Sequence, residues 1–219
     1  MIKQPCGGAR SFFVWLCLAC SLAPSEALAV LPWGTQIGGY HLTPGAPAVF
    51  AFSNGRWEWY PERLSGHGKK WQCVEFVNRF YAEAFGMDIE GGDARYYYQR
   101  AASKGLEAFS NGSAASIQPG DVLCSEGPPY GHVAIVRSVE PDGLHIVQQN
   151  WFNDARDLNT VLSLSVRDGR THVGGFGYRH PICGWLRAPA AVRPDRRIMP
   201  VDAQPPAATG GRPTARPQA

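Results

Sequence analysis

The sequence predicts an α+β fold in which N-terminal helices pack on an antiparallel β-sheet. Two observations support this class. Residues 73–85 carry apolar side chains at helical spacing, and Gly86 follows them as a stop signal. From Pro119 onward, turn residues separate short runs rich in Val and Ile, which is the pattern of antiparallel strands. Helices that precede a series of strands are typical of α+β domains.

The helical part contains a second expected element. Asp93 is a favourable N-cap, and the residues up to Ser103 then continue without a breaker until Gly105. The sequence therefore predicts two helices before the sheet.

The expected strands follow in order. Pro119-Gly120 and Pro141-Asp142-Gly143 are turn signals between apolar runs. The runs that we expect to form strands are 121–124, 132–139, 144–152 and 182–186.

Composition is that of a folded protein with flexible ends. The chain has 219 residues, of which 44% are hydrophobic, and its seven Trp, eight Tyr and ten Phe exclude disorder throughout. We expect a single domain over 30–187 and a disordered tail over 188–219, which holds seven Pro and five Arg. Both ends are basic and the domain between them is not, so we expect no nucleic-acid partner.

The first 29 residues read as a secretory signal peptide. Lys3 and Arg10 make the start positive, and residues 11–22 form an apolar run. Ala27-Leu28-Ala29 then offers small residues for cleavage before Val30. The run is short for a membrane span, so we expect a secreted or periplasmic protein with no stable span after cleavage; an uncleaved anchor is the alternative.

Export changes the meaning of the cysteines. The mature chain would keep Cys73, Cys124 and Cys183, an odd number, so at least one thiol has no partner within the chain. Cys124 and Cys183 lie in apolar, strand-like surroundings, where either two buried thiols or one disulfide would fit.

Cys73 is the candidate nucleophile. It starts the first helix, where free N–H groups and the helix dipole favour a thiolate. His132 starts an apolar strand and is the candidate general base and acid. Gln72 precedes the cysteine, so its side-chain amide and the Cys73 N–H would form an oxyanion hole.

The base needs a third residue to orient its ring. Gln148 and Asn150 lie on one face of the returning strand, and either would serve. A tight turn at Asp142-Gly143 would place His132 opposite Asn153, so a wider loop or a bulge must intervene if Gln148 is to reach the ring.

Three motif blocks, in this order, resemble the CHAP domains (cysteine, histidine-dependent amidohydrolases/peptidases). They are Trp71-Gln72-Cys73-Val74-Glu75-Phe76, Gly131-His132-Val133-Ala134-Ile135-Val136 and Ile146-Val147-Gln148-Gln149-Asn150-Trp151. Within that family the motifs are most similar to the amidase domain of glutathionylspermidine synthetase/amidase, and the likeness covers most of 34–187.

The resemblance implies a papain-like fold in which Cys73 is the nucleophile, His132 the base and Gln72 an oxyanion donor. The family commonly has Glu where this chain has Gln148, and its Asn two places later matches Asn150. We expect Trp71 and Trp151, which flank these motifs, to contact substrate.

Three functions follow from this resemblance. The first is an exported thiol-dependent hydrolase, monomeric and without metal or cofactor, that cleaves amide bonds in peptidoglycan or a similar peptide. The second is an amidase for a small γ-glutamyl or polyamine conjugate, although Asn78 replaces the amidase's Arg. The third is a catalytically weak wall-binding accessory module, which the neutral Gln148 keeps open.

Overall fold

The computed structural model describes residues 29–41, 48–55, 64–193 and 199–200. The predicted signal peptide lies outside them except for Ala29. Among the described residues, no helix is long and apolar enough to cross a membrane.

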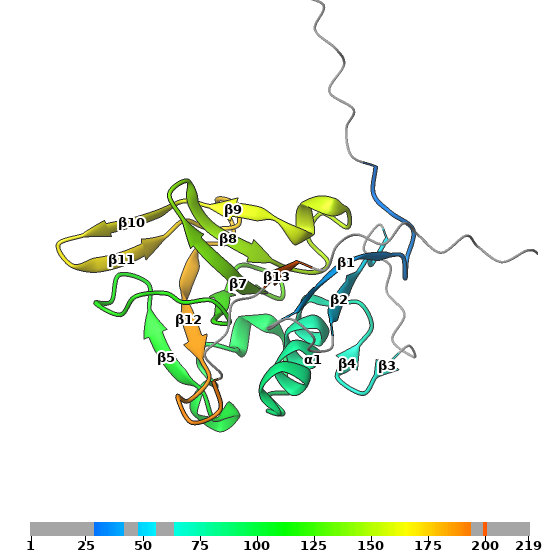
Figure 1. Cartoon of the computed structure of the whole chain (residues 1–219), viewed down its shortest axis with the longest axis horizontal. Helices are drawn as coiled ribbons and strands as arrows, with labels where there is room; N and C mark the ends of the chain where they lie inside the picture. Colours follow the sequence, from blue (N-terminus) through cyan, green and yellow to red (C-terminus); the bar gives the residue numbers. More distant parts are fainter. Residues whose placement is uncertain (1–28, 42–47, 56–63, 194–198, 201–219) are drawn as a thin grey trace, which may run out of the picture.

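A six-stranded antiparallel sheet forms the centre of the domain (Figure 1). It has the order β5-β12-β6-β7-β8-β9. Its strands are β5 (Glu107–Ser110), β6 (Val122–Ser125), β7 (His132–Glu140), β8 (Gly143–Val147), β9 (Thr160–Leu162) and β12 (Ile182–Arg187).

Smaller sheets and short helices surround this centre. One three-stranded sheet has the order β13-β1-β2, and two hairpins pair β3 with β4 and β10 with β11. Their bounds are β1 (Gln36–His41), β2 (Val49–Phe52), β3 (Leu64–Ser65), β4 (Gly68–Lys69), β10 (Leu164–Arg167), β11 (Arg170–Val173) and β13 (Met199–Pro200). The short 3-10 helices are η1 (Ala94–Tyr96), η2 (Ala102–Lys104) and η3 (Ala155–Leu158).

The predicted first helix is confirmed as α1 (Cys73–Phe85). It ends where Gly86 adopts a left-handed conformation with φ of 65°, which Gly accepts without steric cost. Its apolar face packs against one face of the sheet, and alternate β7 residues such as Val133 and Ile135 point toward it. The intervening β7 residues face a second cluster around Trp185 on the opposite side.

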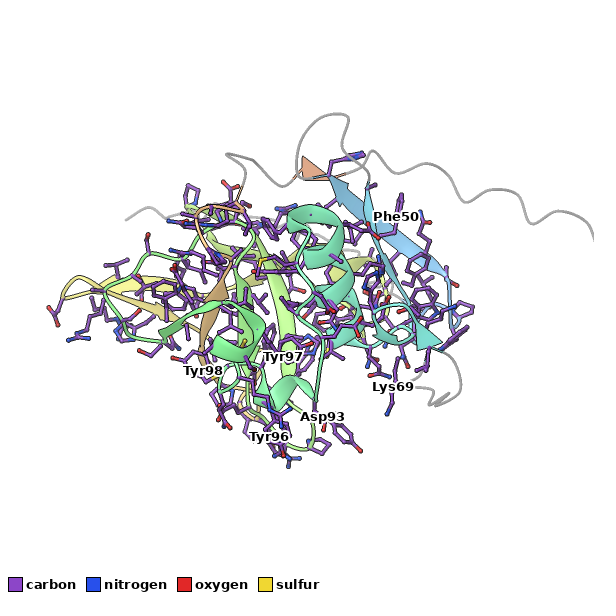
Figure 2. All side chains as sticks on the ribbon, turned by 90° about the horizontal axis from the view of Figure 1, so that it is seen from below. Phe50, Lys69, Asp93, Tyr96, Tyr97 and Tyr98 are labelled. Atoms are coloured by element: carbon purple, nitrogen blue, oxygen red, sulfur yellow. The ribbon has the colours of Figure 1, made fainter. Side chains whose placement is uncertain are left out.

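The second predicted helix is wrong: Asp93–Ser103 forms η1, a series of turns and the start of η2 instead of a continuous α-helix. Three consecutive tyrosines explain the difference. Tyr97 is fully buried, whereas Tyr96 is 38% exposed and lies at the surface in Figure 2. Tyr98 packs tightly over Gly184 of β12. Because successive side chains are buried in different places, no single helical face would satisfy them. Of the two predicted N-terminal helices, only the first is therefore found as an α-helix, α1.

A β-bulge interrupts the pairing of β7 with β8. The turn is Pro141-Asp142, because Glu140 pairs with Gly143, and the register shifts between Val136 and Ser138. The expected bulge is thus confirmed, while the turn lies one residue earlier than Asp142-Gly143. A single inserted residue changes which side chains oppose each other along the rest of the hairpin.

The described part of the domain extends beyond residue 187, although the sequence predicts that the tail starts at residue 188. Ala188 is buried and Arg193 donates a hydrogen bond to the Gln118 side chain at 2.7 Å. Strand β13 pairs with Tyr40 and His41 of β1. Residues 194–198 and 201–219 of the predicted tail lie outside the described residues.

Gly131, just before the candidate base, is required by close backbone contact. Its φ is +74°, and a Cβ there would lie 2.4 Å from the Arg95 nitrogen and 2.5 Å from the Ser125 oxygen. We expect Gly131→Ala to lower the free energy of unfolding by about 3 kcal/mol, measured by urea denaturation.

Gly169→Ala is the matched control, because Gly169 has a φ of +69° but nothing within 4 Å of the added Cβ. It should cost only the left-handed strain, about 1 kcal/mol. Equal losses in the two variants would contradict the steric argument.

Candidate active site

Cys73 is the first residue of α1, as predicted, and its sulfur faces free backbone N–H groups. The N-cap residue Gln72 is extended and makes no side-chain capping bond. The N–H groups of Cys73, Val74 and Val133 interact with Sγ. Val133 directly follows His132, so the candidate nucleophile lies against the backbone next to the candidate base.

The N–H groups at the helix start lower the pKa of Cys73, as expected, but burial outweighs their effect. Only 9% of the residue is exposed, and this burial raises the pKa of the thiol to about 11 despite the N–H groups around it. The Asp93 carboxylate raises the pKa further. Because removing a thiolate from water costs more than three peptide dipoles return, the resting state is a neutral thiol.

His132 is equally buried. Its ring packs against Trp151 at 4.7 Å and edge-on against Phe176 at 4.8 Å, both between ring centroids. Burial lowers the pKa of His132 to about 3, so its imidazole is neutral at neutral pH. Among the hydrogen bonds of these described residues, none joins the ring to the Cys73 sulfur. Burial thus favours the neutral form of both the thiol and the imidazole.

Gln148, and not Asn150, contacts the His132 ring. The Gln148 Oε1 lies 2.9 Å from Nε2 of His132, and the Gln148 side chain is fully buried. Gln148 Nε2 in turn donates to the Thr160 hydroxyl at 2.9 Å. The structure thereby decides between the two orienting residues that the sequence allowed.

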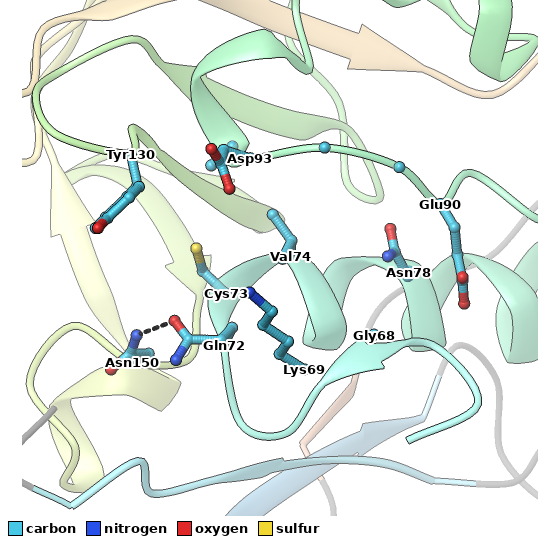
Figure 3. Close-up of a pocket in the computed structure, with 13 residues that line it drawn as sticks. Gly68, Lys69, Gln72, Cys73, Val74, Asn78, Glu90, Asp93, Tyr130 and Asn150 are labelled. Carbon is cyan, nitrogen blue, oxygen red and sulfur yellow. Dashed lines mark hydrogen bonds between the residues drawn. The ribbon is translucent and has the colours of Figure 1, made fainter. Parts of the chain in front are cut away.

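Asn150 instead holds Gln72, the candidate oxyanion donor. Its Nδ2 donates to Oε1 of Gln72 at 2.7 Å (Figure 3). Asn150 has a left-handed φ of 62°, so the chain leaves the strand direction directly after Gln149. This bond engages the side-chain carbonyl of Gln72 and leaves the side-chain NH₂ group out of it.

Gln149 fixes the backbone beneath the same residue. Its Nε2 donates to the backbone carbonyl oxygen of Gln72 at 3.0 Å and to the Glu75 carboxylate at 2.9 Å. Its Oε1 accepts a hydrogen bond from the backbone N–H of Phe52 at 2.8 Å. Glu75 also pairs with Arg79 at 2.9 Å. Sequence reasoning missed Gln149, Glu75 and Thr160. Only the four-residue spacing of Glu75 and Arg79 gave a signal.

A cavity of about 490 Å³ opens beside the sulfur. Gln72, Cys73 and Asn150 line it together with the loop that carries Glu90 and Asp93. The remaining lining residues are Gly68, Lys69, Val74, Asn78, Gly91, Gly92, Ala94 and Tyr130. In Figure 3 the Cys73 sulfur points into the space between Tyr130 and Asp93.

The acidic loop of this cavity is held from behind by a buried lysine. Lys104 Nζ donates to the carbonyl oxygens of Ile89, Glu90 and Gly91, and it lies 4.0 Å above the Tyr97 ring. Burial lowers the pKa of Lys104. These contacts tie the loop that carries Glu90 and Asp93 to η2.

Trp71 and Trp151 do not line the cavity. Trp71 stacks on Phe52 with 4.1 Å between ring centroids, and Trp151 packs on the His132 ring. Their contact with substrate stays a prediction.

The other two cysteines among the described residues, Cys124 and Cys183, are free thiols. The Cys183 thiol donates to the Cys124 carbonyl oxygen at 3.2 Å, and burial raises the pKa of Cys183 to about 11. Of the two arrangements that the sequence allowed, the structure has the unbonded one. Within the described ranges, no three His, Cys, Asp or Glu side chains gather in the manner of a metal site.

One comparison with known proteins identifies the region that contains this site. The CHAP domain family model matches residues 63–150, which span Gln72, Cys73, His132, Gln148 and Asn150. No curated protein matches the chain. CHAP domains are papain-like, and members of the family are generally hydrolytic amidases or peptidases. The part of the chain that holds this site, residues 63–150, is therefore similar to CHAP domains.

Proposed function

We propose that this chain is an exported thiol-dependent amidohydrolase or endopeptidase that cleaves amide bonds in peptidoglycan. The observation that carries the proposal is the position of Cys73, at a free helix start and open to a cavity, inside the CHAP match. The family generally hydrolyses amides, often in peptidoglycan. Export rests on the N-terminal sequence alone.

The proposed first half-reaction forms a thioester. The thiol proton of Cys73 passes to Nδ1 of neutral His132 as Sγ attacks the scissile carbonyl carbon. The Cys73 N–H and the Gln72 NH₂ group stabilise the oxyanion. When the C–N bond breaks, the imidazolium returns its proton to the leaving amine.

The second half-reaction hydrolyses the thioester. His132 removes a proton from water as the water oxygen attacks the acyl carbon, and the imidazolium returns this proton to Sγ when the C–S bond breaks. Since the resting groups are neutral, charge develops only as substrate fills the cavity and the proton moves. The Gln148 carbonyl then stabilises the imidazolium, less strongly than a carboxylate would.

The cavity wall suits a substrate with a protonated amine. Asp93 supplies a carboxylate near the sulfur, and Glu90 supplies a second one farther along the cavity wall (Figure 3). Amino groups occur in peptidoglycan stem peptides and also in polyamine conjugates, so this wall alone favours both of the amidase hypotheses. Asn78, which replaces the amidase's Arg, has its amide engaged by Tyr97 and by the His67 carbonyl. Asn78 thus lacks the positive charge of that Arg.

Mass spectrometry of fragments released from purified sacculi tests the proposal. We expect soluble fragments with new amino and carboxyl ends that identify the cleaved amide. Cys183→Ala is the matched thiol control and should release the same fragments. Cleavage of a γ-glutamyl or polyamine conjugate with intact sacculi would replace the proposal by the small-molecule amidase. Binding to sacculi without any cleavage would favour the accessory module.

A further inference from the structure

The Gln148 amide can face the His132 ring in two orientations that differ chemically, whereas the two oxygens of a carboxylate are equivalent. A Glu presents an acceptor oxygen to the histidine in either orientation. The amide of Gln148 has nearly the same shape after a 180° flip, but its donor and acceptor then change places. A flipped Gln148 would direct its NH₂ group at the His132 ring and favour the wrong tautomer.

A chain of hydrogen bonds removes this ambiguity. The Arg156 carbonyl oxygen can only accept, so the Thr160 hydroxyl, 2.8 Å away, donates to it. The Thr160 oxygen is then an acceptor for Gln148 Nε2 at 2.9 Å. The Gln148 Oε1 is left to face His132 Nε2 at 2.9 Å.

The polarity continues into the imidazole. Because Oε1 accepts, the His132 Nε2 carries the proton in the neutral ring. Nδ1 is then unprotonated and is the nitrogen able to take a proton from a thiol. Gln148 is fully buried, so water does not compete for its amide.

We propose that Thr160 is a positioning residue: its hydroxyl locks the Gln148 amide so that neutral His132 keeps the Nε2–H tautomer that a general base requires. The catalytic consequence rests on the proposed function, but the tautomer itself does not. Thr160 lies on β9 and pairs with Ile146 of β8. Strand β9 therefore supplies the hydroxyl that fixes the orientation of the Gln148 amide.

Nitrogen-15 NMR of the histidine-labelled full chain tests the tautomer directly, with His132 identified by its loss in His132→Gln. We expect a protonated Nε2 and an unprotonated Nδ1 in the wild type. Thr160→Val, which keeps the β-branched shape, should populate the opposite tautomer, and Thr160→Ser should restore the wild-type spectrum.

Kinetics on the released-fragment assay provide the second readout. Thr160→Val should lower kcat by about tenfold or more with little change in KM, since a wrong histidine tautomer removes the base. In a Gln148→Glu background the same substitution should have no such effect, because a carboxylate has no donor to misdirect. A purely structural role for Thr160 would produce equal losses in both backgrounds.

The outcomes separate the two claims. An unprotonated Nε2 in the wild type, or identical spectra for Thr160→Val and wild type, would overturn the role of Thr160. A correct tautomer response without amide hydrolysis would support Thr160 and refute the proposed enzyme activity.

Discussion

Cys73→Ala is expected to abolish amide hydrolysis, with kcat lowered by at least about 10⁴-fold. The physical reason is that Cys73 is the only thiol among the described residues that line the cavity, and it lies at the free N–H groups of α1. The measurement is fragment release from sacculi at saturating substrate, with unfolding followed separately by urea denaturation.

His132→Ala combined with Cys73→Ala provides the internal check. The double variant should be no less active than Cys73→Ala alone, because groups that act as one unit have non-additive effects. Cys183→Ala should retain activity, since its thiol contacts the Cys124 backbone and lies outside the cavity. Full activity of Cys73→Ala would remove the thioester mechanism.

Alkylation of Cys73 by iodoacetamide should be slow at neutral pH. With a pKa of about 11, the thiolate fraction at pH 7 is about 10⁻⁴, about 300-fold below that of a free thiol with a pKa near 8.5. The rate should therefore rise through pH 8, 9 and 10. Peptide mapping of timed samples separates Cys73 from Cys183, whose pKa burial also raises to about 11.

The opposite result would identify a different resting state. If the alkylation rate reached a plateau below pH 7, Cys73 and His132 would already be a thiolate–imidazolium pair. A denatured sample gives the reference rate, because unfolding removes the burial that is the largest cause of the raised pKa.

The sequence predicted the elements whose pattern is local. The apolar repeat and Gly86 predicted α1, and a continuous apolar run predicted β7. The segment 93–103 failed because its three tyrosines are buried against different parts of the fold, which no local pattern reports. The hairpin register depended on a bulge whose need was predictable but whose place was not.

The candidate site divides along the same line. By itself the sequence determined which side chains have the chemistry of a thiol hydrolase: Cys73, His132 and Gln72. Only the tertiary structure decided that Gln148 contacts the His132 ring and that Asn150 holds Gln72. It also decided that the Thr160 hydroxyl accepts a hydrogen bond from the Gln148 amide. Burial likewise decided that Cys73 rests protonated. The reason is that hydrogen-bond partners and desolvation depend on residues brought together from distant parts of the chain. The apolar periodicity of a helix or strand, by contrast, is a property of a few consecutive residues.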